Sequence, residues 1–515
     1  MSRELLVPGR LALATLFSWL DRAPVRLVLD PAFLPRVEAA RRLVERFAVG
    51  DQPVYGINTG FGKLARVRIP PDKTRELQRR LVLSHMCGVG APFDADIVRL
   101  TLILTAAGLG HGRSGVRPIV IDRVLEFLAH DCLPVVPSQG SVGASGDLAP
   151  LAHIAGALIG VGEVDLAGRR MSADEAHRCL SLSPLALEAK EGLALLNGTR
   201  VSTACALVAW RKAMRLFDTA LLAGAASTDA ALGSDVPFDR RLSQLRNQPG
   251  QGEVAARLSA LLAGSGIRAS HLACDRVQDP YCLRCQPQVM GACLDLLLEA
   301  GRCLEQEANG VSDNPLVLVE EEEILSGGNF HGEPVAFACD RIALALAEIG
   351  SLAERRIALL VEGTTSGLPA FLVRDPGLDS GFMIAQVTAA ALASENKHLA
   401  HPVSVESLPT SGGQEDHVSM SAYAARRLQP MCDNLARILA IELMVAAQGI
   451  EFRRPLRSSA AIEAVVAAVR ETSPPLEQDR PLASEIETLA RAVLSGTFLA
   501  AVAPAVDVAA SLRVR

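Results

Sequence analysis

Long stretches rich in alanine and leucine limit the fold of this chain more than any other feature. They cover residues 201–232, 289–308 and 333–361. Both residue types are strong helix formers. In the last stretch apolar residues recur at steps of three to five, as on one face of a helix, and they are Ile342, Leu346, Ile349, Leu352 and Ile357. The sequence therefore predicts a mainly α-helical fold, a bundle of long helices with very few short strands.

Sequence signals for strands and breaks are few. Residues 316–319 and 324–325 can form one short hairpin around the glutamate run 320–323. The polar stretch 246–252 is predicted to be a loop, and 472–475 a break before short amphipathic helices.

Charge and composition exclude several classes of partner. The net charge of -6 is spread over 515 residues without a basic run, so we expect no nucleic acid and no membrane partner. The most apolar stretch, 148–161, is shorter than the roughly 20 residues that span a bilayer. The charged start, Met1–Glu4, does not resemble a signal peptide. The odd total of 11 cysteines favours reduced thiols in the cytoplasm. We interpret Cys282 and Cys285 as packing thiols, with a redox or zinc role as the alternative.

The stretch Ser141–Pro150 can undergo an unusual internal reaction. If it is compressed, the amide nitrogen of Gly146 can attack the carbonyl carbon of Ala144 and close a five-membered ring. Loss of water from Ser145 then leaves a methylidene, a strong electrophile. Asp147 is a suitable N-cap, and Leu148–Pro150 a suitable first helical turn. The positive end of that helix would draw electrons from the ring.

This stretch resembles the prosthetic-group segment of the aromatic amino acid ammonia-lyases, whose Ala-Ser-Gly forms 4-methylidene-imidazol-5-one (MIO). Other segments between Val54 and Ile450 resemble the same family in the same order, and they are Tyr55–Gly62, Leu81–His85, Glu191–Thr199, Gln278–Pro287, Ser326–His331 and Gln414–Met420. The resemblance implies a carbon–nitrogen lyase with MIO built from Ala144, Ser145 and Gly146. We expect no metal and no dissociable cofactor.

The resemblance also implies an architecture. It is the fumarase/aspartase-like helical fold, with an N-terminal domain carrying the loop (1–200), a central long-helix bundle (201–470) and a C-terminal helical cap (471–515). It further implies a homotetramer whose active sites are shared between subunits.

Elimination of ammonia needs a base for the β-proton. The resemblance points to Tyr55, whose pKa would have to fall from about 10, and Tyr281 and Glu415 stay open as alternatives. Arg284 lies three residues from Tyr281, so the two would share a helix face. Its guanidinium suits the substrate carboxylate.

Other motif residues are expected to line the pocket. Asn197 can hold the ring carbonyl or the substrate, Gln278 can hydrogen-bond nearby, and Phe330 can exclude water from the ring.

His85 and Glu415 determine the expected substrate. Both can hydrogen-bond an imidazole ring, and the segment containing Glu415 resembles the histidine-specific branch of the family. Asp416 and His417 are expected to structure the Glu415 loop. The implied reaction converts L-histidine to trans-urocanate and ammonia. Met86 departs from that branch, because the resemblance leads us to expect a small residue there.

The alternatives are a tyrosine or phenylalanine lyase, an aminomutase of the same family, and a non-catalytic helical scaffold.

Overall fold

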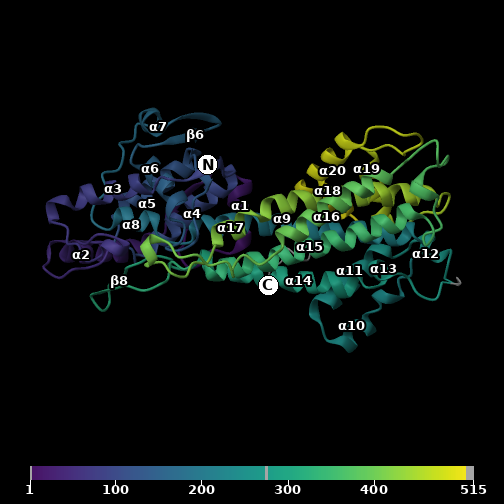
Figure 1. The fold of residues 1–515 in the computed structure, drawn as a ribbon, viewed down its shortest axis with the longest axis horizontal. Coiled ribbons are helices and arrows are strands. Elements are labelled where there is room, and N and C mark those ends of the chain that lie inside the picture. The colour runs from purple at the N-terminus through teal and green to yellow at the C-terminus, as the bar shows by residue number, and fades with distance from the viewer. Residues whose placement is uncertain (1–2, 273–275, 506–515) are drawn as a thin grey trace. The chain divides into compact units, whose positions relative to one another are not determined.

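The computed structural model of the chain describes residues 3–272 and 276–505. Met1, Ser2 and the last ten residues of the predicted cap, 506–515, lie outside the described residues. The chain divides into two compact units, whose helices Figure 1 labels. The first unit comprises residues 1–208, 301–339 and 402–426, and the second comprises 209–300, 340–401 and 427–515. The division at residues 200 and 470 stays a prediction.

The prediction of a mainly helical fold is confirmed. The long helices are α9 (Arg200–Ala230), α14 (Gln286–Ala308), α15 (Glu333–Glu362), α16 (Met383–Leu399) and α18 (Leu428–Glu451). Helices α9, α14 and α15 correspond to the three predicted alanine- and leucine-rich stretches. Pro334 lies in the first turn of α15, where its missing N–H costs little.

The second unit consists of helices. Within it, α16 and α20 (Ala483–Ser495) lie along α18. The shorter helices are α10 (Arg240–Arg246), α11 (Pro249–Leu262), α12 (Gly266–Ala269), α13 (Tyr281–Arg284), α19 (Ala460–Arg470) and α21 (Thr497–Val502). Because α19 ends at Arg470 and α20 starts at Ala483, the predicted break at 472–475 is confirmed.

The predicted loop at 246–252 is wrong. Only Asn247 and Gln248 separate α10 from α11, and Asn247 takes a left-handed conformation that ends α10. The glycine that suggested a loop instead allows two helices to meet. A Cβ atom on Gly250 would lie 2.2 Å from the carbonyl oxygen of Gly291 on α14.

Short helices and small sheets build the first unit. Its helices include α1 (Leu13–Asp21), α2 (Leu34–Val49), α3 (Thr74–His85), α4 (Ala95–Gly110), α5 (Pro118–Ala129), α6 (Leu148–Leu158), α7 (Ala173–Cys179), α8 (Glu191–Leu196) and α17 (Ser421–Arg426). One apolar cluster joins α2 to later segments, and its buried members include Val44, Ile57 and Val317.

In the described part of the chain, the strands pair in four small sheets. Strands β1 (Arg3–Leu6) and β2 (Arg26–Leu29) are parallel. The antiparallel sheets are β3 (Val89–Pro92) with β5 (Pro137–Gln139), β4 (Cys132–Pro134) with β6 (Glu163–Leu166) and β7 (Arg169–Ser172), and β8 (Leu316–Leu318) with β9 (Glu323–Leu325). The last pair confirms the predicted hairpin. Among the described residues, no helix is both long and apolar enough to cross a membrane.

Candidate active site

The Ala144–Gly146 loop connects β5 to α6 and is held against Gly198. Gly146 has a φ of 76°, and a Cβ atom there would lie 2.1 Å from the Gly198 carbonyl oxygen, so only glycine fits. The Asp147 N–H donates to this oxygen at 2.7 Å, and the Gly198 N–H donates to the Ser145 carbonyl at 3.2 Å. These contacts fix the backbone on both sides of Gly146.

Asp147 occupies the predicted N-cap position of α6, but its carboxylate does not cap that helix. It accepts instead from the backbone N–H and the hydroxyl of Ser202, at 2.7 and 3.0 Å. Ser202 lies in the first turn of α9, where backbone N–H groups need acceptors. Burial raises the pKa of Asp147 to about 6, although the bonds from Ser202 oppose the shift.

Glu415 lies directly at the loop. Its Oε1 accepts from the Ser145 hydroxyl at 2.9 Å. Its Oε2 accepts from the hydroxyls of Thr410 and Ser411, at 2.7 and 2.8 Å. The following residues hold the other side of the loop, because the Ser419 hydroxyl donates to the Gly143 carbonyl at 3.0 Å. Segments distant in sequence thus meet around Ser145.

Tyr55 lies in a neighbouring loop. Its hydroxyl accepts from the Gly62 N–H at 3.3 Å, and its ring meets Phe61 edge-on. The short helices η2 (Gly62–Leu64) and η6 (Ser411–Gly413) are in contact, which brings this loop to the Glu415 segment. Burial raises the pKa of Tyr55, and the Glu415 charge acts in the same direction, whereas the Gly62 bond opposes them. The positive charge that a tyrosine base needs must therefore come from elsewhere.

Asn197 lies at the C-terminal end of α8, and only the nitrogen of its side-chain amide is hydrogen-bonded among the described residues. Its Nδ2 donates to the Asp313 carboxylate at 3.2 Å and to the Asn314 carbonyl at 2.9 Å. Its Oδ1 is buried, with no hydrogen-bond partner among the described residues. Such an atom is costly unless a ligand satisfies it. Asn197 is therefore placed to accept a hydrogen bond.

A fully buried ion pair, which residue types and motifs did not predict, supports Asn197. Lys190 Nζ lies 2.8 Å from Asp313 Oδ2, and neither side chain is exposed. Burial lowers the pKa of Lys190, which the Asp313 carboxylate opposes. Asp313 directly precedes Asn314, in a segment outside the recognised motifs. Only the fold brings it to Asn197.

His85 ends α3, shortly before strand β3. Its Nδ1 lies 2.9 Å from the Leu81 carbonyl oxygen, which can only accept. Nδ1 is therefore the donor, and Nε2 is left as an acceptor. Strand β3, which follows, pairs with β5 directly before the loop.

Met86, which departed from the expected pattern, is accommodated by glycines. A Cβ atom on Gly156 of α6 would lie 2.5 Å from Met86 Sδ, and one on Gly162 would lie 3.2 Å from its Cε. The Met86 side chain therefore occupies the space above these two glycines.

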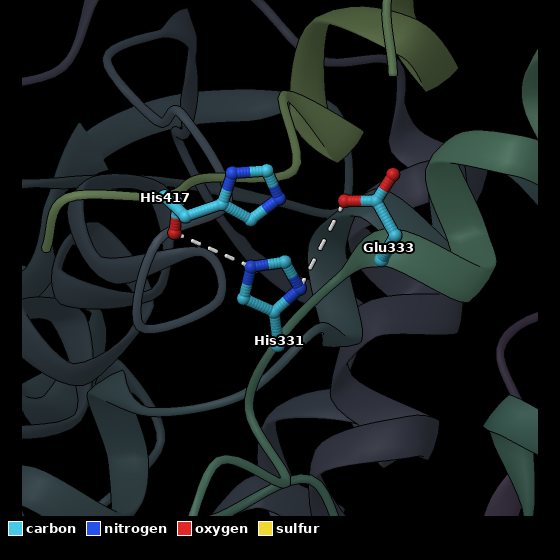
Figure 2. Close-up of side chains that lie close together, drawn as sticks. All are labelled: His331, Glu333 and His417. Carbon is cyan, nitrogen blue, oxygen red and sulfur yellow. Dashed lines mark hydrogen bonds and ion pairs between the residues drawn. The ribbon is translucent and has the colours of Figure 1, made fainter. Parts of the chain in front are cut away.

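Phe330 is half-buried and lies in the segment that leads to α15. A Cβ atom on Gly332 would lie 2.4 Å from the Ser421 hydroxyl. The Phe330 segment therefore contacts the residues next to Ser419, which holds the Ala144–Gly146 loop. The next side chain, His331, stacks on His417 with the ring centroids 5.8 Å apart. Glu333 lies beside them, as Figure 2 shows.

Gln278, Tyr281 and Arg284 belong to the second unit, and their described contacts lie within it. The Arg284 guanidinium carbon lies 4.4 Å from the centroid of the Tyr281 ring, so the two side chains share a face as predicted. Tyr281 is 69% exposed, and Gln278 is also exposed. Arg284 Nε is buried without a hydrogen-bond partner in the described part of the chain. The exposed Tyr281 and Gln278 and the unpaired Nε of Arg284 are thus available to a ligand, as far as the described residues show.

Comparison with known proteins shows which family the chain resembles. The family described as aromatic amino acid lyase matches residues 11–471. A histidine ammonia-lyase from Aromatoleum aromaticum is 56% identical over 498 residues, covering 97% of this chain and 94% of the relative.

Solved structures give the same result. The histidine ammonia-lyase from Trypanosoma cruzi has a TM-score of 0.91 at 38% identity, covering 100% of this chain and 97% of the other. A tyrosine aminomutase from Streptomyces globisporus has a TM-score of 0.92 at 35% identity, covering 98% and 99%. By the family match and the sequence identity, this chain belongs to the aromatic amino acid lyase family.

Proposed function

We propose that this chain is a histidine ammonia-lyase, which converts L-histidine to trans-urocanate and ammonia. The observation that carries the proposal is the 56% identity to a protein of that activity over nearly the whole length of both chains. At the site, the Glu415 carboxylate at Ser145 supplies the acceptor that an imidazole substrate needs.

We propose that Ala144, Ser145 and Gly146 form MIO. Bond formation between the Gly146 nitrogen and the Ala144 carbonyl carbon, with loss of two waters, leaves the Ser145 carbonyl oxygen on the ring. The Gly198 N–H that donates to this oxygen would draw electrons from the ring. When formed, the group supplies an electrophile that turns the substrate amine into a leaving group.

Ring formation would also change the surroundings of Glu415. Its Oε1 accepts from the Ser145 hydroxyl, the oxygen that dehydration removes. Oε1 would then be free to accept from an imidazole N–H, while Thr410 and Ser411 continue to hold Oε2. The His85 Nε2, an acceptor when Nδ1 donates to Leu81, can take the second ring N–H of a substrate whose imidazole is protonated.

Other side chains would orient the amino acid. The unsatisfied Asn197 Oδ1 suits the substrate ammonium group. Arg284 suits the carboxylate, because a guanidinium can donate two parallel hydrogen bonds to it. Gln278 is a further hydrogen-bonding group, and Phe330 would exclude water.

The β-proton must pass to a base, for which we propose the Tyr55 hydroxyl oxygen. The raised pKa of Tyr55 means that a cationic group must approach before the phenolate becomes available. Tyr281 remains the alternative base.

We further propose that the protein forms a homotetramer whose active sites are shared between subunits. We also propose that it acts in the cytoplasm. Gln278, Tyr281 and Arg284 could be supplied to the loop by a second copy. The exposed apolar side chains Ile384 and Val387 on α16 support burial between copies.

The chief alternative is a related enzyme acting on tyrosine or phenylalanine. Fold likeness does not decide between them, because the TM-scores to the histidine lyase and the tyrosine aminomutase are 0.91 and 0.92. The decisive experiment measures kcat/KM of the wild-type chain for L-histidine, L-tyrosine and L-phenylalanine. We expect a preference for L-histidine with urocanate and ammonia in equal amounts. A preference for L-tyrosine, or a β-amino acid product, would overturn the proposal.

A further inference from the structure

We propose that His331, Glu333 and His417 bind a divalent transition-metal ion, with Zn²⁺ the best match. The two imidazoles and the carboxylate each offer one ligand atom, and these atoms all lie within 4.8 Å of one another. All three residues belong to the first unit. Figure 2 shows the His417 ring beside that of His331, with the Glu333 carboxylate next to both.

Hydrogen bonding orients His331 as a metal ligand. Its Nε2 lies 3.4 Å from the His417 carbonyl oxygen, which can only accept, so Nε2 carries the proton in this contact. Histidines that bind metals commonly donate their second ring N–H to a backbone carbonyl in this way. The Nδ1 lone pair is then left for the ion.

The Nδ1 atom of His331 faces Glu333 Oε2 at 4.0 Å. The His417 ring adds a third ligand atom to the same small space. One ion between the three groups would therefore contact both imidazoles and the carboxylate.

The donor set and the distances suit zinc. Two histidines and one carboxylate form a known zinc combination, which leaves a fourth position for water. With Zn–N bonds near 2.0–2.1 Å, tetrahedral ligand atoms lie about 3.4 Å apart. The present separations would therefore close slightly on binding. The exposed His417, on a loop, can make that adjustment.

An ion here would link two segments that are far apart in the sequence. His331 and Glu333 lie at the start of α15, and His417 is two residues from Glu415, whose carboxylate meets Ser145. Binding would fix the Glu415 segment to α15. This site differs from the expectation of no metal, because its ligands come from segments far apart in the chain and form no local motif.

The test measures zinc binding rather than catalysis, so its outcome does not depend on the proposed reaction. The untagged full chain is stripped with a chelator and dialysed against buffered Zn²⁺ near neutral pH, and bound zinc is counted by elemental mass spectrometry. The variants are Glu333→Gln and His417→Gln. The control is His398→Gln, which changes an exposed histidine on α16 outside the cluster.

We expect one zinc ion per chain in the wild type and in the control. Loss of one ligand should weaken binding at least as much as loss of an outer-shell partner does, about tenfold or more. Circular dichroism verifies that each variant is folded. The visible absorption of bound Co²⁺ reports the coordination number and should weaken in both variants.

Two results would overturn the proposal. The first is zinc affinity in Glu333→Gln and His417→Gln equal to that of the wild type. The second is absence of stoichiometric zinc in the wild type.

Discussion

Replacing Glu415 with glutamine tests the role of the carboxylate at the loop. The substitution keeps the size of the side chain and removes its charge. In the present geometry Oε2 accepts from Thr410 and Ser411, and Oε1 accepts from Ser145. If the glutamine oxygen stays with the two hydroxyls, its NH₂ group faces the substrate. That places a donor opposite the imidazole N–H.

The expected loss follows from these contacts. A hydrogen bond to a charged group contributes about 1.5–3 kcal/mol. This corresponds to a drop of roughly 10- to 150-fold in kcat/KM for L-histidine. If the glutamine turns its oxygen toward the substrate instead, a neutral hydrogen bond survives and the loss lies at the lower end.

The assay follows urocanate by its ultraviolet absorbance, after intact mass has shown that the variant lost the same two waters as the wild type. A matched control is Ser411→Ala, which removes one support of Oε2 but keeps the charged carboxylate, and should lower kcat/KM less than Glu415→Gln does. Glu415→Gln enzyme with matured loop and kcat/KM within twofold of wild type would refute the reasoning.

Three further predictions concern the base, the carboxylate contact and the buried acid. Tyr55→Phe should lower kcat by about 10²–10⁴-fold with little change in KM; nearly full kcat would transfer the role to Tyr281. Arg284→Lys keeps the charge but loses the paired donors, so KM for L-histidine should rise. The rise should correspond to about 1.5–3 kcal/mol of lost binding free energy, and an unchanged KM would contradict this. Asp147→Asn should gain stability relative to wild type as pH rises from about 4 to 6. Within that pH window, Asp147 of the native wild type holds a proton that it releases in the unfolded chain. The free energy of unfolding of the wild type therefore falls by up to about 3 kcal/mol. Thermal melting of both proteins across this pH range checks the sign, and parallel pH curves would contradict it.

The sequence predicted the long helices well because their periodicity is local. The observed α15, Glu333–Glu362, nearly coincides with the predicted stretch 333–361. The loop prediction at 246–252 failed because proline and glycine also occur where helices begin or approach closely. Gly250 serves the contact with Gly291, which no local rule reveals.

The candidate site shows the same limit. Residue type and motif identified Ser145, Asn197 and Glu415 as candidates, and the structure places Glu415 against Ser145. The partners that orient them could not be predicted, because Asp313 reaches Asn197 only through the fold. The side chain of Asp147 was assigned to the wrong helix, since a local capping rule ignores the competing N–H of Ser202.

The central claim is that this chain deaminates L-histidine by means of a group made from its own Ser145. The most direct measurement is ammonia and urocanate release from L-histidine by wild type and Ser145→Ala, with the intact mass of each. The account predicts equimolar products and a mass two waters below the sequence for wild type. Ser145→Ala should fold, retain the hydrogen-bonded backbone at Gly198, and turn over slower by orders of magnitude. Wild-type turnover in Ser145→Ala, or an active wild type of unreduced mass, would contradict the account.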